Sequence, residues 1–276
     1  GKSLGYDYFV ALPAGGEKAR EEAIKKHLPQ ASHLILTPSQ EYIAGFPDFL
    51  KEFLKENNGY FFLNHSMGAW NKQRNTYDNN EITLSALQEI AQEVIASGIQ
   101  ISCFVPAVGN GSSILGPGRI LKKHSPAAKI IAFEHFQAAI AFEQKYSRGQ
   151  YEKLFAIKPG ILSRHKLPGT SYQGISFPHI KTAVENLLVD KIVLVSDAHT
   201  AAEYEQLTGK NLVAALPHWD RKFTGCKELG RSTRAGIAVA LEIAKKARNQ
   251  NMLVIAYDKA DRYDTPIVKA SKKPHT

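Results

Sequence analysis

A glycine- and serine-rich segment, Gly-Asn-Gly-Ser-Ser at positions 109–113, carries the residue types best suited to chemistry. It follows the apolar run Ile101 to Val105, which is rich in β-formers and predicts a buried strand. A helical pattern then continues through Leu121. Glycines let the backbone approach a ligand closely, and hydroxyls and free amides at a helix start can surround a phosphate. The segment therefore predicts a site for a phosphorylated ligand.

Two other interpretations of this segment stay open. The spacing Gly109-x-Gly111 after a strand, with Glu134 at the end of the next strand, begins a dinucleotide-binding pattern. Ile114 stands where a third glycine would permit close helix packing, so this match is weak. The remaining interpretation is a glycine turn that serves only the fold.

Two further polar segments occur late in the chain. Ser232 and Thr233 precede an apolar helical run, where a hydroxyl can cap the helix or face the nitrogen of a heteroaromatic ring. Asp258 and Asp261 follow the last predicted strand, near Arg262 and away from any histidine. We expect an Asp–Arg contact to hold this last loop, and we expect no metal site there.

Strands and helices alternate along the chain and could position these segments. The predicted strands cover Tyr8–Leu12, His33–Thr37, Tyr60–Leu63, Ile101–Val105, Ala128–Phe133, Ile192–Val195 and Leu253–Tyr257. The predicted helices cover Glu17–Leu28, Phe49–Leu54, Leu84–Ala96, Phe136–Tyr146, Ser196–Leu207 and Ala235–Ala247. This order predicts an α/β fold with mainly parallel, twisted sheets and helices on both faces.

The length of 276 residues is enough for two domains with cores of their own. We expect a small α/β domain over residues 1–85 and a larger α/β domain over residues 86–276 that holds the glycine-rich segment. A long irregular stretch, residues 149–178, contains four glycines and three prolines. Such a stretch inside a compact domain is typically functional or covers a site.

Composition excludes several classes of protein. Hydrophobic residues make up 43% of the chain, yet no apolar run is long enough to cross a membrane and no signal-peptide pattern is present, so we expect a cytoplasmic protein. The two cysteines form neither a disulfide framework nor a metal-ligand cluster. The net charge of +9 is spread over several helices, so it favours anionic ligands and makes nucleic acid an unlikely partner.

The order of four motifs resembles the cysteine synthase group of the fold-type II, tryptophan-synthase-β-like enzymes, which use pyridoxal 5′-phosphate (PLP). The motifs are Val-Gly-Asn-Gly-Ser-Ser at 108–113, Ile-Ile-Ala-Phe-Glu at 130–134, Gly-Arg-Ser-Thr at 230–233 and Asp-Arg-Tyr-Asp-Thr at 261–265. The resemblance extends over nearly the whole chain. No motif is an exact copy.

The resemblance implies cofactor-binding roles for two groups of residues. The residues that match the loop around the cofactor phosphate are Gly109, Asn110, Gly111, Ser112 and Ser113. Ser232 and Thr233 match the serine pair of which one member bonds the pyridine nitrogen, although Arg234 follows where the family has glycine. Asn64 and His65 lie near the family's substrate-side Gln-Phe pair, and residues 174–178 resemble the loop over the site entrance.

One departure concerns the lysine that holds the cofactor covalently. In the family this lysine, and the loop that binds the substrate carboxylate, precede the strand equivalent to Tyr8–Leu12. Here only Gly1 to Asp7 precede that strand, so the resemblance implies an N-terminally truncated small domain, and the catalytic residue is unknown. Lys18, Lys158 and Lys227 do not lie in the family's Ser-x-Lys context.

Two hypotheses on function follow. By resemblance, a complete protein of this kind is a PLP-dependent homodimeric lyase or transferase that acts on an amino acid by β-replacement or β-elimination. Alternatively, the chain is a catalytically inactive remnant or fragment that binds a phosphate-bearing ligand, another anion or a partner. Whether the chain itself is an enzyme stays open at this point.

Overall fold

A computed structural model describes residues 1–37, 46–146, 165–170, 177–196, 214–216 and 218–263. Its strands are β1 (Val10–Pro13), β2 (Leu34–Thr37), β3 (Trp70–Asn71), β4 (Thr76–Tyr77), β5 (Cys103–Phe104), β6 (Lys129–His135), β7 (Lys191–Val195), β8 (Ala214–Leu216) and β9 (Met252–Leu253). Its α-helices are α1 (Lys18–Lys25), α2 (Phe46–Glu56), α3 (Glu81–Ala96), α4 (Ser112–His124), α5 (Ile140–Tyr146), α7 (Pro178–Glu185), α9 (Trp219–Lys222) and α10 (Arg231–Ala244).

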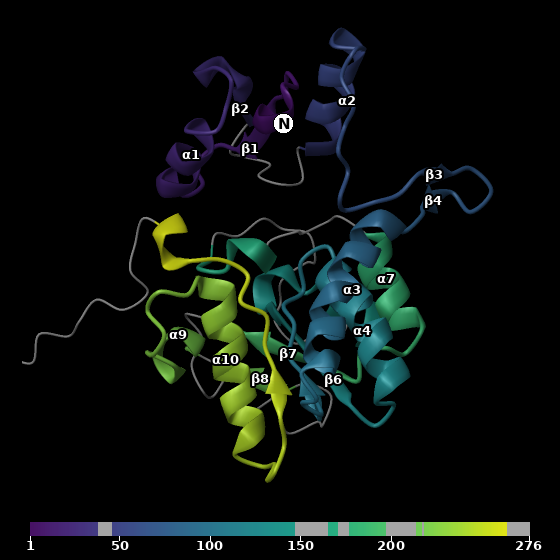
Figure 1. Ribbon diagram of the computed structural model, residues 1–276, viewed down its shortest axis with the longest axis vertical. Helices are drawn as coiled ribbons and strands as arrows, with labels where there is room; N and C mark the ends of the chain where they lie inside the picture. Colours follow the sequence, from purple (N-terminus) through teal and green to yellow (C-terminus); the bar gives the residue numbers. More distant parts are fainter. Residues whose placement is uncertain (38–45, 147–164, 171–176, 197–213, 217, 264–276) are drawn as a thin grey trace, which may run out of the picture.

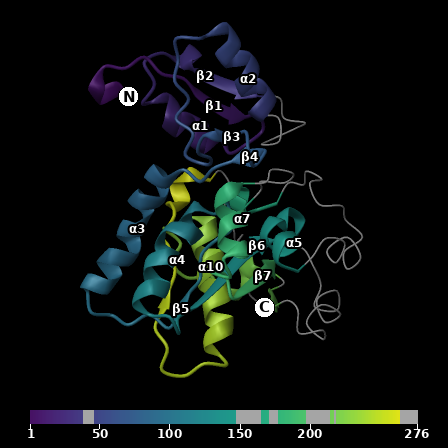
Figure 2. The same ribbon diagram turned by 90° about the vertical axis from the view of Figure 1, so that its right-hand side faces the viewer.

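These elements form two lobes, which Figure 1 shows one above the other. The small lobe contains α1, α2 and the parallel pair β1–β2. The large lobe contains the elements from α3 onward (Figure 2), and the antiparallel hairpin β3–β4 lies on the connection between the lobes. The predicted domain boundary after residue 85 stays a prediction, and helix α3 runs across it.

The large lobe is built on a parallel sheet whose described strands have the order β8-β7-β6-β5-β9. Side chains along a strand point alternately to the two faces, so each strand supplies two cores. Phe104 and Leu194 join the core under α3, α4, α5 and α7. Cys103 and Val193, their neighbours in sequence, join the core under α10. The strands are thus buried on both faces, as parallel strands require, and the predicted α/β fold is confirmed.

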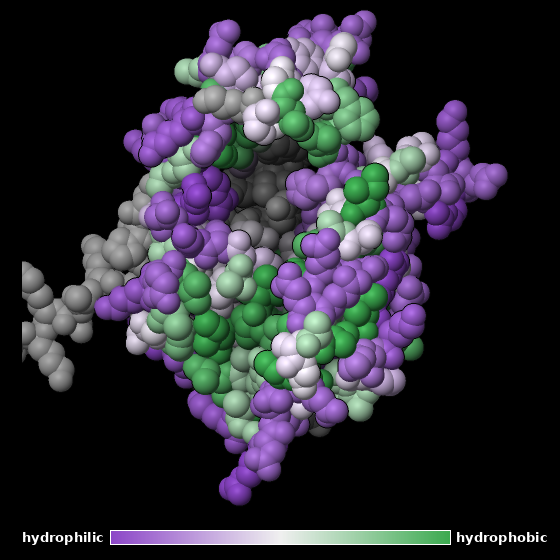
Figure 3. Space-filling model, in the orientation of Figure 1, coloured by the Kyte–Doolittle hydropathy of each residue, from purple (hydrophilic) through white to green (hydrophobic). Residues whose placement is uncertain are grey.

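The helices of the two layers pack closely against their neighbours because glycines lie at the points of contact. A Cβ on Gly116 of α4 would lie 2.8 Å from the Leu84 carbonyl oxygen of α3, and one on Gly236 of α10 would lie 2.9 Å from a methyl carbon of Val254. Figure 1 shows α3, α4 and α7 on one side of the sheet and α9 and α10 on the other. The surface is hollowed between the two lobes (Figure 3).

One predicted strand, Tyr60–Leu63, was wrong. The structure has no regular element there, and the side chains of Phe61 and Leu63 are 86% and 81% exposed. An aromatic run has strand propensity, but a strand forms only where another strand supplies hydrogen bonds, and none does so among the described residues. The predicted helix after Ser196 lies outside the described residues, as does most of the irregular stretch 149–178.

Candidate functional site

The glycine loop, residues 109–113, leaves the carboxyl end of β5 and leads into α4. Val108 donates its N–H to the Phe133 carbonyl at 2.8 Å, which ties the start of the loop to β6. Gly111 is the N-cap of α4 and has a φ of 90°, a left-handed conformation that other residues rarely adopt. A Cβ on Gly111 would lie 2.4 Å from the Ile180 backbone nitrogen. The loop therefore requires glycine where it meets α7.

Part of the hydrogen-bonding capacity of this loop is used within the protein. The side-chain oxygen of Asn110 accepts bonds from the Ser112 N–H at 2.9 Å and from the Ser112 hydroxyl at 2.7 Å. Among the contacts of the described residues, the backbone N–H groups of Gly111 and Ser113 have no protein acceptor. Two such donors at the positive end of a 13-residue helix suit a phosphate group.

Ser232 and Thr233 lie in the first turn of α10 and are buried. The Thr233 hydroxyl oxygen accepts a bond from the Tyr257 backbone N–H at 2.9 Å. The Tyr257 hydroxyl in turn accepts from the Ala107 N–H at 2.8 Å, two positions before the glycine loop. The structure therefore brings the glycine loop and the hydroxyl pair together, with one tyrosine between them.

A chain of polar contacts joins the glycine loop to the loop before α3. The Asn110 amide donates to the Ser66 hydroxyl at 3.0 Å, and Ser66 N–H donates to the Asn64 side chain at 3.2 Å. The Asn80 amide donates to the Asn64 carbonyl, and the Asn80 N–H donates to Nε2 of His179 at 2.9 Å. Asn64 was placed near the site by resemblance alone. Ser66, Asn80 and His179 were missed, because no local pattern marks partners that are 44 positions apart, as Ser66 and Asn110 are, or 99 apart, as Asn80 and His179 are.

The buried ring of His179 makes stability depend on pH. Burial lowers the pKa of His179 to about 4, and its Nε2 must be unprotonated to accept from the Asn80 N–H. An unfolded histidine has a pKa of about 6.5, so protons bind the unfolded chain preferentially as the pH falls from 6.5 toward 4.

We expect the free energy of unfolding to fall over this range, with about 2 kcal/mol of the decrease due to His179. The His179→Gln variant should show a shallower decrease in urea unfolding measured at several pH values. Equal pH slopes for the two proteins would contradict this role of His179.

An ion pair connects the two lobes beside the hydroxyl pair. Arg231 bonds Glu17 at 2.6 Å, and their side chains are only 7% and 17% exposed. The Tyr263 ring centre lies 4.4 Å from the Arg231 guanidinium, and the Tyr263 hydroxyl donates to Asp258 at 2.6 Å. Arg20 of the small lobe also pairs with Asp258, at 3.9 Å. These contacts hold the small lobe against the first turn of α10.

The expected Asp–Arg contact in the last loop is confirmed, and one of its two arginines was not indicated by the sequence. Asp261 pairs with Arg262 at 3.6 Å, whereas Asp258 pairs with Arg20 from the small lobe. Within the described ranges, no group of three or more His, Cys, Asp or Glu side chains could hold a metal ion. Residues 264 and 265 of the fourth motif lie outside the described residues.

The carboxylate of Glu134, which a dinucleotide site would use for a ribose, has another role. Glu134 is fully buried and accepts bonds from the N–H groups of Ala141 and Phe142 at the start of α5. Burial raises the pKa of Glu134 to about 8, although these N–H groups favour the ionised form. The carboxylate of Glu134 thus points at the start of a helix. It is not available to bind a ribose, which the dinucleotide interpretation requires.

Two of the three lysines considered as covalent partners of the cofactor do not have the required environment. Lys18 and Lys227 are exposed, and a Schiff-base lysine needs a desolvated amine. Lys158 lies outside the described residues, as do residues 174–176 of the predicted entrance loop. The structure thus adds no candidate for the catalytic residue from this group.

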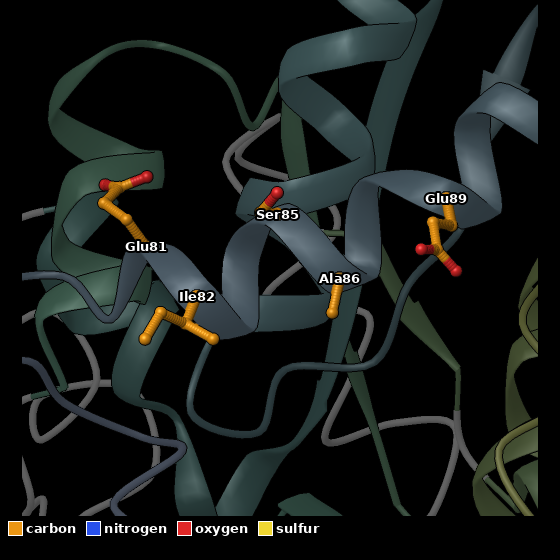
Figure 4. A pocket seen from close by; sticks show the side chains of 5 residues that line it. All are labelled: Glu81, Ile82, Ser85, Ala86 and Glu89. Carbon is orange, nitrogen blue, oxygen red and sulfur yellow. The ribbon is translucent and has the colours of Figure 1, made fainter.

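A shallow groove runs along the exposed face of α3 (Figure 4). Its lining residues are Glu81, Ile82, Ser85, Ala86 and Glu89. All five belong to one helix, and none belongs to the glycine loop or the hydroxyl pair. The groove is therefore separate from the candidate site. None of the described helices is long and apolar enough to span a membrane.

The sequence is similar to bacterial cysteine synthases. A cysteine synthase of Staphylococcus aureus (strain N315) is 30% identical over 130 residues, which is 47% of this chain and 38% of that protein. Cysteine synthase B of Campylobacter jejuni is 22% identical over 260 residues, which is 94% of this chain and 71% of that protein. No known family profile matches the sequence.

The fold is similar to that of solved enzymes of the same kind. The cysteine synthase of Entamoeba histolytica superposes with a TM-score of 0.64 at 20% identity, covering 97% of this chain and 66% of that one. A hydrogen sulfide-producing enzyme of Fusobacterium nucleatum superposes with a TM-score of 0.66 at 19% identity, covering 95% of this chain and 73% of that one. This chain thus spans about two thirds of the amoebic enzyme. In sequence and in fold, it is similar to the cysteine synthase group of fold-type II PLP-dependent enzymes.

Proposed function

We propose that this chain binds PLP and forms part of an enzyme that acts on an amino acid by β-replacement or β-elimination. The observation that carries the proposal is the pair of N–H groups at Gly111 and Ser113, which have no acceptor among the described residues, in a loop that Tyr257 links to Thr233 through Ala107. Cysteine synthase relatives support the reaction class.

The loop residues suit the phosphate end of the cofactor. The α4 N-terminus provides a positive potential and two backbone donors, and Ser113 adds a hydroxyl. Gly111 lets the loop backbone pack directly against Ile180 of α7, which fixes the loop in this conformation. The net charge of +9 raises the local concentration of an anionic ligand.

The hydroxyl pair suits the other end of the cofactor. A hydroxyl that donates to an unprotonated pyridine nitrogen holds the ring without adding charge to it. The Thr233 oxygen already accepts from the Tyr257 N–H, so its own proton is available for such an acceptor. When bound, PLP supplies the electron sink for the reaction, and these residues bind and orient it.

The proposal is tested by calorimetry with PLP, pyridoxal and inorganic phosphate, followed by borohydride reduction and peptide mass spectrometry. We expect PLP and phosphate to bind and pyridoxal to bind more weakly, because it lacks the phosphate. A lysine adduct after reduction would identify the catalytic residue. If neither PLP nor phosphate gives a binding signal, the proposed function is wrong.

A second candidate function is binding without catalysis. It is favoured by the exposure of Lys18 and Lys227, because neither amine is desolvated. Binding of PLP with no lysine adduct would support this alternative. An adduct would exclude it. The resemblance also leads us to propose a homodimer, which light scattering at several protein concentrations would test.

A further inference from the structure

The side chain of Asn110 in the glycine loop is held from both ends. Its amide group donates to the Ser66 hydroxyl at 3.0 Å, and its oxygen accepts from the Ser112 N–H at 2.9 Å and from the Ser112 hydroxyl at 2.7 Å. Asn110 and Ser112 are buried, whereas Ser66 precedes the hairpin β3–β4, 44 positions earlier in the chain. Ser66 is therefore a contact to the glycine loop from outside the sequence motifs.

The directions of these bonds follow from the chemistry of the donors. A backbone N–H can only donate, so the Asn110 group that faces Ser112 is the carbonyl oxygen. The NH2 group of Asn110 then faces Ser66, whose hydroxyl oxygen is the acceptor. A reversed carboxamide would place two donors against each other and leave the Ser112 N–H without an acceptor. Asn110 thus has one orientation that satisfies both neighbours.

Ser66 is itself fixed by the bonds of its own loop. The side-chain oxygen of Asn64 accepts from the Ser66 N–H at 3.2 Å and from the Met67 N–H at 3.1 Å. The amide group of Asn80, the N-cap of α3, donates to the Asn64 carbonyl. The Ser66 hydroxyl is therefore presented to Asn110 by a loop that is tied to the start of α3.

The position of the Asn110 oxygen determines which donors are left for a ligand. It occupies both the N–H and the hydroxyl proton of Ser112, while the N–H groups of Gly111 and Ser113 have no acceptor among the described residues. A side-chain oxygen at a helix start can also accept from the N–H three positions further on, which here belongs to Ser113. An Asn110 side chain that is free to rotate would thus compete with a ligand for the Ser113 N–H.

We propose that Ser66 is a positioning residue that holds the Asn110 oxygen on Ser112 and so keeps the Ser113 N–H free for the phosphate group of a bound ligand. The inference rests on the proposed function, since it assigns that phosphate to the glycine loop. Ser66 does not touch the ligand and acts through Asn110. A serine that only supported its own loop would act independently of Asn110, so the two roles predict different results.

A double-mutant cycle separates these roles. Ser66→Ala, Asn110→Ala and the double variant are compared with the wild type by calorimetry against inorganic phosphate and PLP. We expect Ser66→Ala to weaken the binding of both ligands about fivefold, as for competition by one neutral hydrogen bond. In the Asn110→Ala background, which has no competing oxygen, Ser66→Ala should have no further effect.

Ser66→Thr and Ser97→Ala are the matched controls. Threonine keeps a hydroxyl oxygen that can accept from Asn110, so we expect Ser66→Thr to bind phosphate as the wild type does. Ser97→Ala removes a hydroxyl that donates to the Val94 carbonyl at the other end of α3. It should leave phosphate binding unchanged.

Amide exchange without ligand gives a second readout. In Ser66→Ala, the Ser112 N–H should exchange faster than in the wild type and the Ser113 N–H more slowly, because the Asn110 oxygen moves from the first to the second. A general loosening of the loop would instead speed exchange at both amides. The opposite signs therefore distinguish positioning of Asn110 from a structural role of Ser66.

Several outcomes would overturn the inference. Additive effects in the cycle, or faster exchange at both amides, would show that Ser66 does not act through Asn110. An unfolded Ser66→Ala protein, judged by circular dichroism, would assign the hydroxyl to folding. If the wild type bound neither phosphate nor PLP, the proposed function would be wrong, and amide exchange would then report on the Asn110 contact alone.

Discussion

The Gly111→Ala protein is expected to lose PLP and phosphate binding and to be less stable than the wild type by about 3 kcal/mol. Two causes add up. The φ of 90° strains any residue that has a Cβ, and the new methyl group would lie 2.4 Å from the nitrogen and 2.6 Å from the Cα of Ile180. The loop and α7 must move apart, which displaces the N–H donors. Calorimetry measures the first effect and urea unfolding the second.

Gly98→Ala is the control for backbone strain alone. Gly98 also has a left-handed φ, of 75°, but a Cβ there would have no atom within 4 Å. We expect Gly98→Ala to cost about 1 kcal/mol and to leave ligand binding unchanged. Wild-type affinity in Gly111→Ala, or an equal loss of affinity in Gly98→Ala, would contradict the role given to the loop.

Replacing Arg231 with methionine is expected to lower the free energy of unfolding by about 3 kcal/mol, because the largely buried Glu17 carboxylate would lose its ion pair with the Arg231 guanidinium. The two side chains are 7% and 17% exposed, so water can screen little of this charge. The Tyr263 ring would also lose the guanidinium that lies over it. Urea unfolding at neutral pH measures the loss.

Arg74→Met provides the comparison with an exposed pair. The Arg74 and Asp78 side chains are 65% and 37% exposed, so we expect a loss below about 0.5 kcal/mol. Adding Glu17→Met to Arg231→Met also removes the carboxylate that Arg231 bonds in the wild type and should restore part of the stability. A loss in Arg231→Met as small as that in Arg74→Met would mean that the ion pair does not hold the lobes together.

The fold of the large lobe could be predicted from the sequence because its strands are short, continuous apolar runs. The strand predicted at Ile192–Val195 is β7, where four apolar residues in a row satisfy two cores at once. The run Tyr60–Leu63 is also hydrophobic throughout, but it is mainly aromatic and is not a strand. Composition indicates the strand propensity of a segment, but it does not indicate whether a partner strand lies beside it.

Only those parts of the candidate site that a short sequence pattern indicates could be predicted. Gly111 stands before a predicted helix in a glycine-rich segment, and in the structure it has a left-handed φ. The use of Asn110 as an acceptor for Ser112 depends on rotamers that spacing does not encode. The tyrosine contact to Ala107 joins positions 150 apart, so no window along the chain reveals it.

The pairing of β9 with β5 has a consequence for folding. Because β9 is a short strand at one edge of the sheet, its opening requires few bonds to break, and it belongs with the parts of a protein that exchange amides by local unfolding. Tyr257 follows this strand, so its bond to Ala107, two positions before the glycine loop, depends on the pairing of β9 with β5. We expect the amides of β9 and of Ala107 to exchange through local opening of this edge, before global unfolding.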